Sequence, residues 1–199
     1  MARLKLASAS PRRADLLRQV GLEFDILPSD CLGVDETPRP GEAPDKLIRR
    51  LAQEKARRGL SCPGLPADAV VLGADTAVVL DGQALGKPRD EAEFMQFMQR
   101  LAGRTHEVLT AVAVASSEDC RACLVRTRVA MVSDCADRAA AYWRSGEPVD
   151  KAGGYAIQGR GALLVERVEG SCSAVVGLPL QETAQLLEGF DIFPNWTAS

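Results

Sequence analysis

The chain has 199 residues, of which 46% are hydrophobic and 26% are charged, and its formal net charge at pH 7 is −3. This composition is typical of a globular protein with a buried core. The slight acidic excess disfavours a general nucleic-acid binder, which needs surplus positive charge to displace counterions. Since His106 is the single histidine, zinc sites that need paired histidines are excluded. Any catalytic groups are therefore expected among the carboxylates, lysines, arginines, hydroxyls and thiols.

The lack of a recognisable targeting signal and the pattern of cysteines predict the same cellular compartment. No apolar run approaches the roughly 20 residues needed to cross a bilayer, and the first apolar run is too short for a secretory signal. The sequence therefore predicts a cytoplasmic protein that binds neither membranes nor nucleic acid. The six cysteines are scattered, with Cys120 and Cys123 forming a lone C-x-x-C. This dilute pattern predicts reduced thiols with no shared role.

Segments of strand and helix character alternate along the chain. Alternating apolar residues predict a first strand at 4–6. A helix follows, with Ser10 as its capping residue and Pro11 in the first helical position. The later elements are expected as a strand at 22–26, a loop at 28–44, a helix at 45–58, a buried strand at 70–75, a hairpin at 78–85, a helix capped by Asp90, strands at 108–115 and 124–132, a helix at 134–145, a glycine-rich loop at 150–161, a strand at 162–168 and a helix at 181–188. This alternation predicts a mixed α/β (α+β) fold.

The first candidate site is the segment from Ser8 to Arg13, where a strand gives way to a helix. Free N–H groups and the dipole at a helix N-terminus attract anions, phosphate above all. Arg12 and Arg13 have the wrong charge for a first helical turn, where acids are favoured, but they suit bidentate binding of phosphate. The pattern therefore favours a phosphate site over a solvated basic helix start.

Three further side chains form a second candidate group. Lys55 continues the apolar face of its helix, and the residues alone leave open whether it is functional or reaches solvent at the edge of that face. Asp75 ends the predicted buried strand, where open α/β sheets place catalytic groups, so it is a candidate general base or metal ligand. Glu36, in an acidic loop, is a candidate to share that metal, against the alternative of a solvated acid.

The glycine-rich loop at 150–161 contains Lys151, Tyr155 and Gln158. Its small residues suit closure on a planar ligand, with a flexible loop of incidental polar residues as the alternative. Lys87 follows the hairpin in a segment that does not match a P-loop. His106 is expected to pack or hydrogen-bond, with no catalytic role. Together, cations suited to phosphate and carboxylates suited to Mg²⁺ predict phosphoryl chemistry with a metal and an activated water.

The sequence resembles the Maf family of nucleoside triphosphate pyrophosphatases. The resemblance is carried by blocks in family order that span nearly the whole chain: 6–17, 73–76, 85–88, 106–110, 150–159 and 176–180. It implies one domain at 1–193 followed by a C-terminal tail at 194–199. The implied fold has two lobes around a central cleft, like that of the inosine triphosphatases.

The resemblance also implies roles for single residues. Asp75 is the expected proton acceptor, with Lys55 and Lys87 as its catalytic partners. The expected substrate ligands are Ser8, Arg12, Arg13, Thr76, Lys151 and Gln158. Glu36 and Asp75 are the expected ligands of a divalent cation, Mg²⁺ or Mn²⁺. The implied reaction cleaves a nucleoside triphosphate to the monophosphate and pyrophosphate, and a homodimer is left open.

Arg13, Thr76 and Gln158 match the branch of the family that acts on dTTP and UTP. The methylated-GTP branch instead resembles Trp-Arg in the first block, Ser-Asp-Gln at the aspartate and Glu at the amide position. Since an amide both donates and accepts hydrogen bonds, Gln158 suits a pyrimidine edge. The expected function is hydrolysis of dTTP and UTP, which extends to removal of modified pyrimidine nucleotides. The alternatives are a methylated-GTP pyrophosphatase and a non-catalytic nucleotide-binding regulator of cell division.

Overall fold

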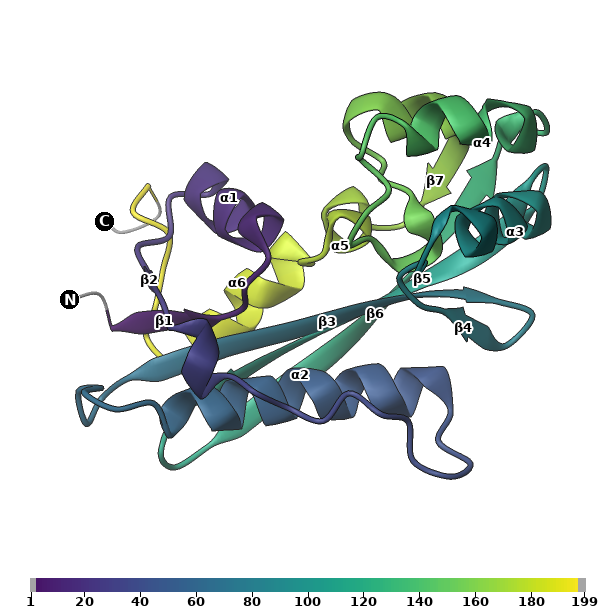
Figure 1. Cartoon of the computed structure of the whole chain (residues 1–199). Helices are drawn as coiled ribbons and strands as arrows, with labels where there is room; N and C mark the ends of the chain where they lie inside the picture. Colours follow the sequence, from purple (N-terminus) through teal and green to yellow (C-terminus); the bar gives the residue numbers. More distant parts are fainter. Residues whose placement is uncertain (1–2, 197–199) are drawn as a thin grey trace. The chain divides into compact units, whose positions relative to one another are not determined.

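The computed structural model describes residues 3–196 (Figure 1). The strands are β1 (Leu4–Ala7), β2 (Asp25–Ile26), β3 (Val70–Leu80), β4 (Gln83–Leu85), β5 (Thr105–Ala115), β6 (Cys120–Met131) and β7 (Val165–Glu169). The α-helices are α1 (Pro11–Gln19), α2 (Pro44–Leu60), α3 (Glu91–Leu101), α4 (Cys135–Trp143), α5 (Cys172–Val176) and α6 (Leu180–Glu188). Short 3-10 helices are η1 (Ser29–Cys31), η2 (Ala152–Gly154) and η3 (Gly159–Leu164). Across 3–196, each helix is too short or too polar to cross a membrane.

Within the described range, the strands form one seven-stranded sheet in the order β2-β1-β3-β5-β6-β7, with β4 paired to β3. Strand β1 is parallel to both β2 and β3. Strand β4 runs antiparallel to β3, and β7 runs antiparallel to β6. Helices interleaved with a sheet of mixed direction confirm the predicted mixed α/β class.

The chain forms two compact units. Unit 1 comprises the residues up to Asp75 together with Thr110–Val125 and the residues from Gly177 onward, and unit 2 comprises Thr76–Leu109 and Arg126–Val176. The chain passes between the units within strands β3, β5 and β6 and again between Val176 and Gly177, after α5. The central cleft implied by the resemblance stays a prediction, as does the single domain at 1–193. The start of that domain (1–2) and the end of the predicted tail (197–199) lie outside the described residues.

In unit 1, α2 covers one face of the strands and α1 and α6 cover the other (Figure 1). The buried stripe of α2 repeats at helical spacing and consists of Leu47, Ile48, Leu51, Ala52, Ala56 and Gly59. Its second half contains only small residues, which permit a close approach of the helix to the sheet. Beyond α6, Asn195 N donates to Gly21 O over 2.9 Å and Trp196 Nε1 donates to Val20 O over 2.9 Å.

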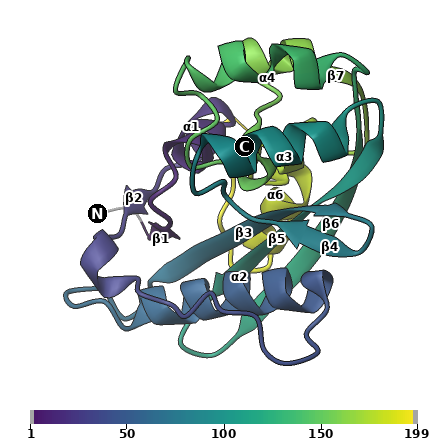
Figure 2. The same ribbon diagram turned by 45° about the vertical axis from the view of Figure 1, so that its right-hand side comes forward.

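The core of unit 2 is built around α3 and α4, which lie side by side (Figure 2). Asp90 caps α3 as predicted, because its side chain accepts a hydrogen bond of 2.9 Å from Glu93 N. Phe94 is fully buried on the inner face of α3. Its ring lies 6.1 Å from that of Tyr142 and 5.1 Å from that of Trp143, both on α4.

The structure corrects several predicted boundaries. The buried strand and the first arm of the hairpin are one continuous strand, β3, so the strand does not end at Asp75. Only Asp25 and Ile26 form the second strand, because it pairs with β1 at those two positions alone. Strand β6 begins at Cys120, so the C-x-x-C lies within the strand instead of before it.

The C-terminal third differs from the prediction in three places. The glycine-rich loop contains η2 and the start of η3. Since η3 continues to Leu164, the following strand begins only at Val165. The short helix α5 was not predicted from the sequence at all.

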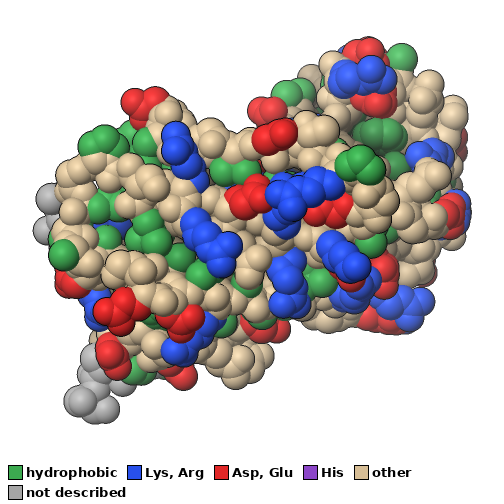
Figure 3. Space-filling view, turned by 90° about the horizontal axis from the view of Figure 1, so that it is seen from below, with side chains coloured by type: hydrophobic (Ala, Val, Ile, Leu, Met, Phe, Trp, Pro, Cys, Tyr) green, Lys and Arg blue, Asp and Glu red, His purple; other side chains and the backbone are tan. Residues whose placement is uncertain are grey.

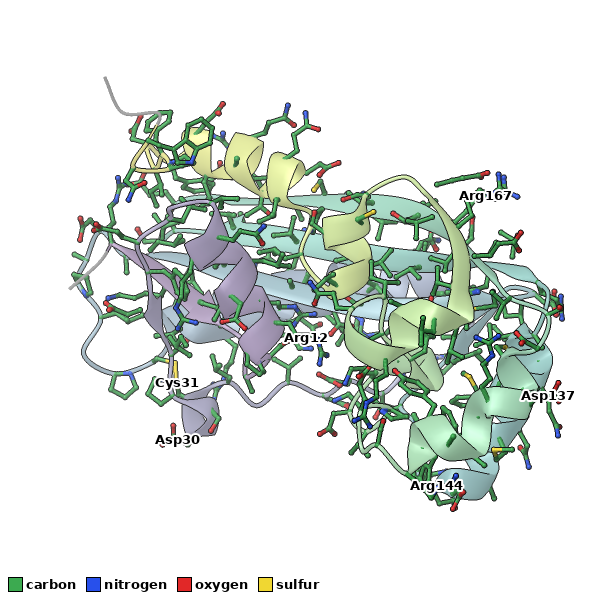
Figure 4. The ribbon with its side chains drawn as sticks, turned by 90° about the horizontal axis from the view of Figure 1, so that it is seen from above. Arg12, Asp30, Cys31, Asp137, Arg144 and Arg167 are labelled. Carbon is green, nitrogen blue, oxygen red and sulfur yellow. A yellow bond between two sulfur atoms is a disulfide. The ribbon has the colours of Figure 1, made fainter. Side chains whose placement is uncertain are left out.

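The prediction of reduced thiols is wrong for one cysteine pair. Cys31 in η1 and Cys62, which follows α2, form a disulfide with a Cα–Cα distance of 5.5 Å (Figure 4). Ala7, Leu27, Val71 and Cys62 share one apolar cluster, and Cys31 packs against it. The fold thus brings together two cysteines that are 31 positions apart in sequence, while the remaining cysteines, Cys120, Cys123, Cys135 and Cys172, are free.

Candidate functional site

The segment before α1 is held by a hydroxyl and a guanidinium. Pro11 occupies the first turn as predicted, but the Ser10 side chain makes no capping hydrogen bond. The buried Ser8 Oγ instead accepts the Ser10 N–H over 3.2 Å. Arg13 Nη1 donates to the same Ser8 Oγ over 3.0 Å, and Arg13 Nε donates to Gly177 O over 2.9 Å. Arg13 is therefore fixed in unit 1 by both ends of its guanidinium.

Arg13 lies within a group of facing charges. Burial lowers its pKa, the carboxylate of Asp75 raises it, the neighbouring Arg12 lowers it and Glu36 raises it, with a net lowering. Since arginine stays protonated in proteins, the side chain remains a cation. Arg12 is half-buried at the start of α1 (Figure 4). Two arginines at the start of a helix without first-turn acids support the predicted anion site.

A lysine and two carboxylates meet beside these arginines. Lys55 Nζ on α2 lies 2.5 Å from Asp75 Oδ1 and 2.6 Å from Glu36 Oε1. The Lys55 and Asp75 side chains are each 15% exposed, whereas Glu36 is 61% exposed. The contacts exclude the alternative that Lys55 reaches solvent, because its ammonium faces two carboxylates instead of bulk water. We call these three residues the carboxylate–lysine cluster.

The position of Lys55 depends on a close approach of α2 to β3. A Cβ atom on Gly73 would lie 2.5 Å from both Ala52 O and Ala56 N. Side chains two residues apart in a strand face the same side, so Gly73 and Asp75 both face α2. Only a glycine at 73 lets the helix come near enough for Lys55 to reach Asp75.

Replacing Gly73 with Ala is expected to lower the free energy of unfolding by about 1–3 kcal/mol, because the added methyl overlaps backbone atoms that cannot rotate away. The displaced helix would carry Lys55 away from Asp75, so turnover should fall by at least about tenfold. Urea unfolding and steady-state kinetics measure the two effects. Gly33→Ala is the matched control, since a Cβ there meets nothing within 4 Å. Equal stability and activity of the two variants would contradict this role of Gly73.

The sequence predicts Asp75 at the end of a strand. In the structure it lies in the middle of an eleven-residue strand. The prediction placed it at the carboxyl edge of the sheet, but the strand continues through Thr76 to Leu80. A carboxylate within this largely buried strand is tolerated because Lys55 pairs with it. The partner is supplied by a helix packed on the sheet, which local sequence does not reveal.

Glu36 and Asp75 are the predicted ligands of a divalent cation. Among residues 3–196, no group of three or more His, Cys, Asp or Glu side chains is arranged to hold a metal. Glu36 and Asp75 nevertheless contact a common cation, the Lys55 ammonium. Mg²⁺ is commonly bound through one or two carboxylates, with waters and substrate phosphates completing its shell. The two carboxylates fit that mode of binding.

The other predicted ligands belong to unit 2: Thr76, Lys87, Lys151 and Gln158. Thr76 follows Asp75 directly in β3. Lys87 and Gln158 are exposed, and Lys151 Nζ donates a hydrogen bond to Glu147 O. The loop of Lys151 is joined to that of Lys87, because Gly153 N donates to Gly86 O over 2.9 Å. The structure thus places these two lysines on connected loops.

His106 is buried and makes a hydrogen bond, as the sequence predicts. Its Nε2 lies 2.5 Å from Tyr155 Oη, and the two rings meet edge to face. Burial lowers the pKa of His106 to about 4, so the ring is neutral at pH 7. No histidine is visible on the molecular face drawn in Figure 3, where acidic and basic side chains are interspersed.

The sequence alone gives no predicted role to Glu147, an acid between Gly146 and Pro148. Its carboxylate accepts hydrogen bonds from the Tyr142 hydroxyl and from the backbone N–H groups of Arg160 and Gly161. The only sequence signal was an acidic residue before a glycine-rich loop, and such residues are usually solvated.

The described residues define a mixed α/β protein whose unit 1 gathers arginines, a lysine and two carboxylates, a set suited to phosphate groups. Residues 3–190 match the family model described as Maf-like protein. The chain therefore belongs to the Maf family, as the sequence blocks indicated.

Curated relatives match over nearly their full length. The dTTP/UTP pyrophosphatase of Pseudoalteromonas translucida (strain TAC 125) is 50% identical over 185 residues, which cover 93% of this chain and 95% of the relative. The dTTP/UTP pyrophosphatase of Methylobacillus flagellatus is 50% identical over 188 residues, which cover 94% of this chain and 92% of the relative. That of Salmonella typhimurium (strain LT2) is 47% identical over 192 residues, covering 96% and 94%.

Proposed function

We propose that this protein is a nucleoside triphosphate pyrophosphatase that hydrolyses dTTP and UTP to the monophosphate and pyrophosphate. The carboxylate–lysine cluster carries the proposal, because it joins a candidate base to a cation within unit 1. The names of the relatives, all dTTP/UTP pyrophosphatases, support the choice of substrate.

In the proposed mechanism, the start of α1 binds the phosphates. Arg12 and Arg13 supply guanidinium groups suited to phosphate oxygens. The Ser8 hydroxyl, which accepts a hydrogen bond from Arg13, orients that side chain. The free N–H groups of the first helical turn add to the same positive potential.

Asp75 acts as the general base. It accepts a proton from water, and the oxygen of that water forms a bond to the α-phosphorus. The P–O bond that joins the α-phosphorus to the bridging oxygen breaks, and pyrophosphate leaves with that oxygen. Lys55 offsets the negative charges of Asp75 and Glu36 and then those of the phosphates. Lys87 and Lys151 supply further positive charge to the leaving group. A lysine that already contacts the base is positioned for this role before substrate arrives.

Glu36 and Asp75 would hold Mg²⁺ or Mn²⁺. When bound, such a cation offsets phosphate charge and lowers the pKa of a coordinated water. Gln158 and Thr76, both in unit 2, distinguish the base. The exposed Gln158 amide offers both a donor and an acceptor to a pyrimidine edge.

Incubation with dTTP, UTP, dGTP and methylated GTP, each with Mg²⁺ or Mn²⁺ and with a chelator, tests the proposal. We expect dTMP and UMP with equimolar pyrophosphate, and no product with the chelator. Preferential hydrolysis of methylated GTP would show that the protein is a methylated-GTP pyrophosphatase instead. Binding of nucleotides without turnover of any of them would favour a non-catalytic regulator.

A further inference from the structure

In unit 2, the side chain of Glu147 forms hydrogen bonds that hold the loop containing Gln158. Glu147 Oε1 accepts the Gly161 N–H and the Tyr142 hydroxyl, each over 2.9 Å. Glu147 Oε2 accepts the Arg160 N–H over 3.0 Å. Both carboxylate oxygens thus hold the backbone that directly follows Gln158.

The same residue also fastens the other end of the loop. The backbone carbonyl of Glu147 accepts a hydrogen bond from Lys151 Nζ. The Tyr142 oxygen, which donates to Glu147, accepts the Ala156 N–H over 3.2 Å. Glu147 therefore links, directly or through Tyr142, three points along the loop that contains Lys151 and Gln158, two of the four predicted ligands of unit 2.

The backbone closes tightly around this carboxylate. A Cβ on Gly159 would lie 2.7 Å from Glu147 Oε2, and Gly159 has a φ of +67°. A Cβ on Gly161 would lie 2.3 Å from Ala156 O and 2.5 Å from Tyr142 Oη. The two glycines thus permit a contact that side chains would prevent.

The carboxylate is ionised at neutral pH. Burial raises the pKa of Glu147. This effect is outweighed by four groups that lower the pKa, so the net change is a lowering: the N–H groups of Gly161 and Arg160, the Tyr142 hydroxyl and the charge of Lys151. Hydrogen bonds to an ionised acceptor are about twice as strong as neutral ones. The exposed Gln158 has little packing of its own, so its direction follows the backbone that Glu147 holds.

We propose that Glu147 is a positioning residue for base selection, because it fixes the backbone beside Gln158 and the side chain of Lys151 so that the amide meets the base in one orientation. The inference rests on the proposed function and extends it to a residue that does not itself touch the substrate. A second anchor supports the same loop, since Tyr155 is hydrogen-bonded to His106 and buried.

Glu147→Gln tests the role with almost no change of volume. Whichever way the amide turns, its NH₂ group meets a backbone N–H, that of Arg160 or that of Gly161, so one hydrogen bond is replaced by a repulsive contact. We expect the KM for dTTP to rise about tenfold and the ratio of kcat/KM for dTTP over dGTP to fall about tenfold, with kcat within about threefold of wild type. Tyr142→Phe should shift KM and the ratio in the same direction by less. Glu166→Gln, an exposed acid of the same unit, is the matched control and should change neither.

The outcomes separate the two proposals. If the wild type hydrolyses dTTP selectively and both loop variants keep its KM and selectivity, the positioning role is wrong and the proposed function stands. A fall in kcat alone, equal for all substrates, would show a loss of folded protein and would also overturn the role. If the wild type hydrolyses no triphosphate, the proposed function fails first. Should Glu147→Gln not fold, as judged by circular dichroism, Tyr142→Phe decides the matter.

Discussion

Replacing Asp75 with Asn is expected to lower kcat for dTTP by about 10²–10⁴-fold, the usual contribution of a general base. The amide has the same shape but cannot accept the proton of the attacking water. Lys55 and the α1 arginines remain, so the affinity for nucleotide should change much less than kcat. Pyrophosphate release measures the first quantity, and calorimetric titration with dTTP in the presence of Ca²⁺ measures the second.

Asp68→Asn is the matched control for this substitution, because Asp68 is in the same unit and its side chain is 69% exposed. It should keep wild-type kcat and affinity. Turnover by Asp75→Asn at the wild-type rate would remove Asp75 from the role of base. A parallel loss of kcat and binding would instead indicate that Asp75 mainly supports the position of Lys55.

Local sequence signals predicted much of the fold because their causes are local. Pro11 at the start of α1 and Asp90 at the cap of α3 act within one helical turn, and both are observed. The helical spacing of apolar residues in α2 likewise predicted the face that the helix buries. The prediction of an anion site at Ser8–Arg13 rests on a similarly local signal, since a strand-to-helix turn with two arginines contradicts the usual charge preference.

Long-range contacts account for what could not be predicted from the residues alone. Lys55 and Asp75 pair because Gly73 admits α2 to the sheet, and neither the helix nor the strand pattern contains that information. Family resemblance, not periodicity, assigned Gln158 to the substrate. The contacts of Glu147 connect residues up to 14 positions apart around a loop without regular spacing.

The Cys31–Cys62 disulfide is the sharpest case of a long-range contact. Sequence spacing did not pair the two cysteines, which became neighbours only when η1 packed against the apolar cluster beside the end of α2. The bond closes a loop that contains Glu36 and Lys55. Constraining a loop of this length in the unfolded chain stabilises a protein by about 3–4 kcal/mol in the chain-entropy model.

Reduction by dithiothreitol, or the double substitution Cys31→Ala/Cys62→Ala, is therefore expected to lower the free energy of unfolding by about 3–4 kcal/mol. Urea unfolding with and without reductant measures the difference, and thiol titration in denaturant reports whether the bond is present. The control is Cys120→Ala/Cys123→Ala, which removes two free thiols of the same unit and should respond to reductant as the wild type does. The double Cys31/Cys62 variant should show no response to reductant, because no bond remains to break. Equal stability of oxidised and reduced wild type would mean that the apolar cluster alone holds η1 against α2.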